Sequence, residues 1–107
     1  MTEYCSVYIT APDKVSATAI ARMLVDLRLV ACANIISDMT SVYRWKDEVR
    51  VDDEVAIIAK TRRELVPPLI AKVRATHPYD CPCIVTWRIE AGNPDYLDWI
   101  GKETSGD

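Results

Sequence analysis

The sequence predicts an α+β domain of the ferredoxin-like type, with elements in the order βαββαβ followed by a short terminal helix. Two observations predict it. Residues 31–60 have the pattern of one long β-hairpin, and a segment of helical periodicity lies on each side of that hairpin. An antiparallel sheet with two helices on one face satisfies this order. No linker or repeat interrupts the chain, so residues 1–107 are predicted to form one domain.

The first strand and the first helix follow from periodicity. Residues 5–10 alternate, which places Cys5, Val7 and Ile9 on one apolar face of a strand. Asp13 then provides a suitable helix N-cap. Apolar residues at helical spacing predict the face that packs on the sheet: Ile20, Met23, Leu24 and Leu27.

The hairpin consists of residues 31–45 and 49–60, joined by the triplet 46–48. Each arm has roughly twelve to fifteen residues, or some 40 to 50 Å at about 3.3 Å per residue. A domain of this size has a radius of gyration of only about 13 Å. The hairpin should therefore extend beyond its own core. Its far end still carries apolar side chains, which predicts packing on another copy of the chain: Val42, Tyr43, Trp45, Val49 and Val51.

An alternative for the first arm stays open at this point. The polar segment 37–40 permits a break into two short strands within a monomer.

The second helix has two possible starts. Residues 61–64 have the spacing of a capping box, but Pro67 and Pro68 would then lie inside the helix. Either the helix begins near residue 65 or 66, or it begins at Thr61 with a kink. Pro78 should end it.

The last strand and the third helix complete the chain. Residues 84–90 form the strand, with Val85, Trp87 and Ile89 on one face. Asn93 and Pro94 then give an N-cap and a first-turn proline, and Gly101 marks the expected helix end. Residues 102–107 are predicted to be a frayed tail.

Composition excludes several classes of function. Thirteen basic and sixteen acidic residues are interleaved along the chain and give a net charge of −3. No basic patch predicts binding to nucleic acid or to a membrane surface. Neither a signal-peptide pattern nor an apolar run of about twenty residues is visible, so a cytoplasmic protein is expected. The four cysteines should then be reduced thiols.

Several segments, in order over nearly the whole chain, resemble the CutA or divalent-cation-tolerance family. They are Ala31–Ile36, Thr40–Tyr43 with Trp45, Lys60–Arg62, His77–Asp80 and Gly92–Ile100. The resemblance implies a homotrimer in which three long hairpins interlock, similar in architecture to the PII signalling proteins. It also implies a role in metal-ion tolerance, with copper binding in some bacterial members, and no established catalytic activity.

The copper site of those members is only partly present. The family pattern has a cysteine before the Thr-Ala-Pro turn and two successive histidines before Pro-Tyr. This chain has Ile9 and Thr76 at two of these positions, and only His77 remains. Asp47 also replaces the usual glycine at the hairpin tip, and Cys83 replaces a usual acid.

The candidate metal ligands are His77, Cys81 and Cys83. An imidazole and two thiolates suit Cu(I) or zinc. On an extended segment, residues two apart point to the same side, which would allow both thiols to bind one ion. Copper is thus a possible ligand, although no cofactor is required. The alternative is that these three side chains bind no metal and serve ordinary packing, with His77 at the end of the helix.

A small-molecule site is the alternative function, as in a PII-like effector sensor. Lys60 and Tyr79, with Arg62 and Tyr43, are the candidate cationic and aromatic walls of a cleft between subunits. In the competing interpretation, Lys60 lies in solvent at a strand end and the aromatic residues belong to the trimer interface. An enzyme is not predicted, because no oxyanion element or orienting partner accompanies His77 and the thiols.

Overall fold

The computed structural model describes residues 2–105 and confirms the predicted element order. The strands pair antiparallel in the sheet order β2-β3-β1-β4, which is the ferredoxin-like arrangement. The elements are β1 (Tyr4–Ala11), α1 (Lys14–Asp26), β2 (Cys32–Trp45), β3 (Glu48–Arg62), the 3₁₀ turn η1 (Arg63–Leu65), α2 (Val66–Thr76), β4 (Ile84–Arg88) and α3 (Pro94–Glu103).

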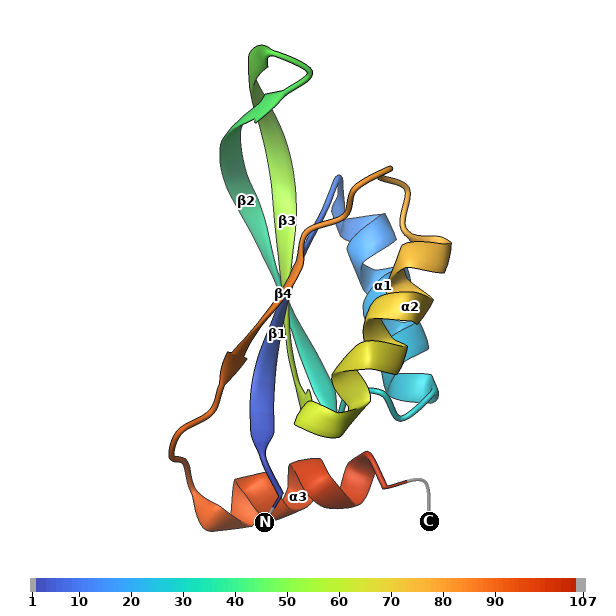
Figure 1. The fold of residues 1–107 in the computed structure, drawn as a ribbon, viewed down its shortest axis with the longest axis vertical. Coiled ribbons are helices and arrows are strands. Elements are labelled where there is room, and N and C mark those ends of the chain that lie inside the picture. The colour runs from blue at the N-terminus through green and yellow to red at the C-terminus, as the bar shows by residue number, and fades with distance from the viewer. Residues whose placement is uncertain (1, 106–107) are drawn as a thin grey trace.

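The core lies between the sheet and the helices α1 and α2, which cover one face of it (Figure 1). Cys5, Val7 and Ile9 of β1 are buried, as their alternation predicts. On α1 the predicted stripe is correct for Ile20 and Leu24. It is wrong for Leu27, which is half-exposed because the helix ends at Asp26 and Leu27 is its C-cap.

Capping and proline positions explain where the two core helices begin. The carboxylate of Asp13 accepts a hydrogen bond from the Ser16 N–H at 2.7 Å and so caps α1. Helix α2 begins at Val66 with both prolines in its first turn, which settles the predicted alternatives in favour of the later start. Thr61 instead belongs to β3, where its buried hydroxyl donates to the Leu29 carbonyl at 2.6 Å.

The β2–β3 hairpin projects well beyond the helical layer (Figure 1), and the molecule is 44 Å long in its greatest dimension. Its turn is shorter than the predicted triplet, because Trp45 already pairs with Glu48. Lys46 and Asp47 both have positive φ, 50° and 65°. This left-handed pair matches the twist of the two strands, which is why two-residue hairpin turns favour it.

A β-bulge bends β2 near its middle. The pairing register with β3 shifts between Ile36 and Met39, and Asp38 has φ 62°. The strand nevertheless continues on both sides, so the predicted alternative of two separate short strands is wrong. Pairing with the continuous β3 holds the arm together across the polar segment.

The C-terminal region is more ordered than the sequence predicts. Strand β4 ends at Arg88, two residues before the predicted boundary, although the Ile89 N–H still donates to the Tyr4 carbonyl. Helix α3 continues through Gly101 to Glu103, so both the predicted stop at Gly101 and the frayed tail are wrong for residues 102–105. Thr104 is buried and caps the helix. Residues 106–107 lie outside the described part.

The sheet face opposite α1 and α2 carries exposed apolar side chains. Ile36, Val85 and Trp87 remain 48–55% exposed there, because α3 lies across only one end of the sheet (Figure 1). The hairpin adds Val42, Val49 and Val51, each more than 60% exposed. Within residues 2–105, no helix is both long enough and apolar enough to cross a membrane.

Candidate functional site

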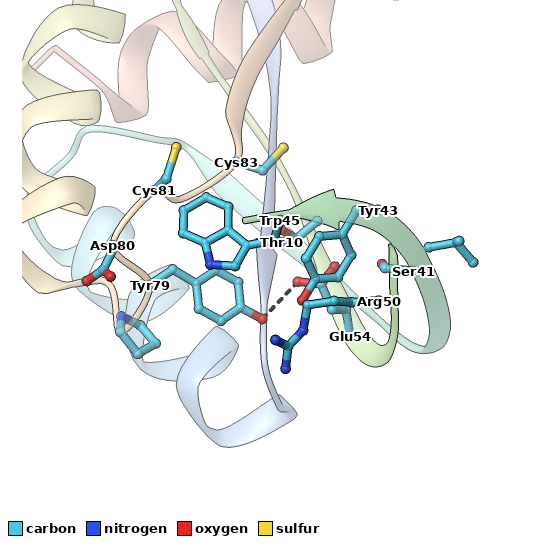
Figure 2. Close-up of a pocket in the computed structure, with 12 residues that line it drawn as sticks. Thr10, Ser41, Tyr43, Trp45, Arg50, Glu54, Tyr79, Asp80, Cys81 and Cys83 are labelled. Atoms are coloured by element: carbon cyan, nitrogen blue, oxygen red, sulfur yellow. Dashed lines mark hydrogen bonds between the residues drawn. The ribbon is translucent and has the colours of Figure 1, made fainter. Parts of the chain in front are cut away.

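A groove of about 680 Å³ lies between the hairpin and the loop that follows α2 (Figure 2). The hairpin contributes one wall and the loop 78–83 the other. Twelve residues line it: Thr10, Ser41, Val42, Tyr43, Trp45, Arg50, Glu54, Pro78, Tyr79, Asp80, Cys81 and Cys83.

Two tyrosine–carboxylate pairs order the polar groups of the groove. The Tyr79 hydroxyl donates to Glu54 Oε2 at 2.8 Å across the groove (Figure 2). Burial, followed by this bond to Glu54, raises the pKa of Tyr79 well above its usual value. Tyr43 in turn donates to Asp52, and this bond raises the pKa of Tyr43. Both phenols are therefore neutral hydrogen-bond donors at physiological pH.

His77 anchors the loop wall and has no free ring nitrogen. Its Nδ1 accepts the Tyr79 N–H at 3.1 Å, so the proton must reside on Nε2, which donates to the Thr10 carbonyl at 2.8 Å. The imidazole is buried, and its centroid lies 4.8 Å from that of the Tyr79 ring. This geometry gives His77 a structural role and conflicts with its predicted role as a metal ligand.

Cys81 and Cys83 lie on the rim of the groove. Cys81 is exposed and Cys83 is half-buried. Their sulfurs point to the same side of the segment, away from Tyr79 (Figure 2), as the spacing predicts. Burial, followed by the nearby Glu54 charge, raises the pKa of the Cys83 thiol. Among residues 2–105, no three His, Cys, Asp or Glu side chains converge to hold a metal ion, so one chain does not assemble the predicted set.

Lys60 and Tyr79, the predicted small-molecule ligands, do not share a site within one chain. Lys60 pairs with Ser6 and Cys32, six positions along β3 from Glu54, or about 20 Å. Arg62 is also engaged elsewhere, because its guanidinium donates to the Thr104 hydroxyl and carbonyl. Only Tyr79 and Tyr43 of the predicted set line the groove.

Sequence reasoning missed Glu54, Arg50 and Trp45 as groove residues. Trp45 was expected only in contacts between chains, and no role was predicted for the two charged residues. The direct cross-strand pairing of Tyr43 with Arg50 places Arg50, Trp45 and Glu54 on the same face of the hairpin as Tyr43. A two-residue turn at Lys46 and Asp47 would have given this register.

Comparison with known proteins then places the chain in a family. A family model described as CutA1 divalent ion tolerance protein matches residues 5–103. The chain belongs to this family. The divalent-cation tolerance protein CutA of Thermus thermophilus is 45% identical over 98 residues, which cover 92% of this chain and 95% of the relative.

Two further members are similar over nearly all of this chain. Protein CutA of Mus musculus is 41% identical over 97 residues, which cover 91% of this chain but only 55% of the mouse protein. The structure of the periplasmic divalent cation tolerance protein CutA of Archaeoglobus fulgidus superposes with a TM-score of 0.92 at 37% identity. That match covers 94% of this chain and 98% of the other. The fold of this chain is thus that of CutA structures.

Proposed function

We propose that this CutA protein takes part in divalent-cation tolerance as a homotrimer that binds copper-like ions through Cys81 and Cys83. The observation that carries the proposal is the orientation of the two thiols, which point to the same side at the rim of the groove (Figure 2). Thiolates favour soft ions such as Cu(I). Family membership supports the role in tolerance.

The binding step transfers protons from thiols to solvent. A metal ligand must be a thiolate, and the pKa of Cys83 is raised, so binding of an ion displaces its proton. Apparent affinity should therefore rise with pH. His77 does not contact the ion in this proposal; its two backbone hydrogen bonds hold the loop that carries both thiols.

The homotrimer is supported by the uncovered apolar surface. The open sheet face and the hairpin together expose eight large apolar or aromatic side chains of the hairpin and β4, of which Val42, Val49 and Val51 are the most exposed. Exposed patches of this kind mark interaction sites in soluble proteins. Two further copies would cover those outside the groove, and ligands for one ion would then be available from more than one chain.

Titration with Cu(I) under anaerobic, reducing conditions against a competing colorimetric chelator tests the metal site. The double variant Cys81→Ser, Cys83→Ser should lose competition for the ion, whereas Cys32→Ser, which removes a thiol remote from the groove, should retain it. Equal binding by the double variant and the wild type would refute the assignment. So would the absence of competition by the wild type.

A second function, a PII-like sensor of a small effector without physiological metal, is favoured by the groove itself. Its volume and its aromatic and charged lining are those of a small-molecule site. In either case the protein acts by binding and not by catalysis. We place it in the cytoplasm, where the four free thiols would remain reduced.

A further inference from the structure

We propose that the groove binds a small organic cation, an alkyl- or arylalkyl-ammonium, between its aromatic walls and its carboxylates. This inference rests on the second of the two proposed functions and names the class of its ligand. It uses Tyr43, Trp45, Glu54, Tyr79 and Asp80, all supplied by one chain.

The charge balance of the lining favours a cation. Glu54 and Asp80 provide two carboxylates against the single guanidinium of Arg50. That guanidinium lies 3.9 Å from the Asp52 carboxylate, which offsets part of its charge. With the Lys46 ammonium beside Trp45 counted as well, three carboxylates stand against two cations, so an ammonium group entering the groove meets net negative charge.

The aromatic walls favour a cation for a separate reason. Three aromatic side chains line the groove, and the negative face of each ring attracts a cation. Tyr79 and Tyr43 both donate their hydroxyl protons to carboxylates, which increases the electron density of their rings. The Lys46 ammonium already lies 6.0 Å from the Trp45 ring centroid, at the distance of a cation–π contact.

The acceptor for an ammonium N–H is already positioned. The hydrogen bond from Tyr79 fixes Glu54 with one oxygen engaged, so the second oxygen can accept from a ligand. Because burial and this bond raise the pKa of Tyr79, its proton stays in place at physiological pH and the bond to Glu54 persists.

Three ligands with one skeleton distinguish this proposal from an anion site at Arg50. Phenethylamine carries an ammonium, 2-phenylethanol a hydroxyl and phenylacetate a carboxylate on nearly the same frame. Calorimetric titration of the full chain, free of metal, should give the tightest binding for phenethylamine and the weakest for phenylacetate. Tighter binding of phenylacetate, equal binding of all three, or no binding would overturn the proposal.

A matched pair of variants locates the site. Glu54→Gln removes one charge but keeps an acceptor for Tyr79, and it should weaken phenethylamine binding at least about tenfold. Asp53→Asn removes the same charge from the adjacent position, where the side chain points to the opposite face of β3, and should leave the affinity within about twofold. Equal effects of the two variants would show a non-specific response to net charge and refute the site. Asp80→Asn provides a second loss-of-charge variant should Glu54→Gln not fold.

The proposed metal site and the proposed amine site are tested separately. In Glu54→Gln, phenethylamine binding should weaken while competition for Cu(I) persists. Weakened competition for Cu(I) together with unchanged phenethylamine binding in that variant would show that Glu54 serves the thiol site and not the amine, and would overturn the proposal.

Discussion

A single imidazole joins the loop after α2 to strand β1. His77 bonds to the backbone on both sides, at Thr10 and at Tyr79, and these two bonds place Tyr79 where its hydroxyl reaches Glu54. The sequence places His77 beside Pro78 at the end of a helix, but nothing local shows that both ring nitrogens are engaged. That fact depends on a carbonyl 67 residues away.

Replacement of His77 by Phe should destabilise the protein by about 2–4 kcal/mol, because the buried Thr10 carbonyl and the Tyr79 N–H both lose their partner. Urea unfolding at fixed protein concentration measures the change. Thr76→Ala is the control, since its hydroxyl bonds are made at the exposed helix surface; it should cost less than about 1 kcal/mol. Equal losses for the two variants would contradict the structural role of His77.

The thiol of Cys83 should react slowly with iodoacetamide at neutral pH. Burial and the Glu54 charge raise its pKa, so the reactive thiolate forms at higher pH than in an ordinary thiol, and the alkylation rate should rise with pH over a correspondingly higher range. Peptide mapping by mass spectrometry follows Cys83 specifically. Glu54→Gln should move the rate profile toward lower pH and Asp53→Asn should not; a profile with the midpoint of an ordinary exposed thiol would refute the shift.

The hairpin is the element that the sequence predicts best. The pairing register of its two strands is what the sequence predicts least well. Runs of β-branched and aromatic residues predict both arms, and their length predicts the projection seen in Figure 1. The bulge at Asp38 was not predictable, because polar residues 37–40 fit a break as well as a bulge. Only pairing with β3, a long-range interaction, decides between them.

The turn at the hairpin tip gives a test of backbone strain. Asp47 has φ 65°, a region in which an L-residue is strained and glycine is not. Asp47→Gly should therefore stabilise the protein by about 0.5–1 kcal/mol in urea unfolding. Glu48→Gly, one residue later in the strand, should instead destabilise it by a similar amount. A loss of stability in Asp47→Gly would contradict the turn geometry.

At the scale of the whole molecule, the sheet is covered on one face only. The sequence predicts this deficit, because βαββαβ order supplies two helices to one face and a single short helix cannot cover the other. It could not predict which residues share the groove, since the hairpin wall and the loop wall come together only when β1, β3 and α2 are packed. For the same reason it could not predict that Lys60 and Tyr79, expected in a cleft between subunits, lie far apart within one chain: that distance follows from strand register.

Charge on the open sheet face should dissociate the assembly. Wild-type protein is expected at three times the 12.1 kDa mass of the chain in light scattering at micromolar concentration. Trp87→Glu places a carboxylate on the uncovered face and should shift the mass toward that of one chain. Val15→Glu also replaces an apolar side chain by a carboxylate, but at an 81% exposed position of α1, and it should leave the mass unchanged. A wild-type mass of 12.1 kDa would refute the trimer.

The start of β1 and helix α3 lie together at the end of the molecule opposite the hairpin tip (Figure 1), and Arg62 fastens that helix to β3 through Thr104. A sensor surface, carrier protein or fluorophore attached at the start of β1 or at the end of α3 would thus stand clear of the hairpin and the groove. Immobilised protein should retain the ligand affinity it has in solution, which makes the chain convenient for surface-based measurement of weak binders.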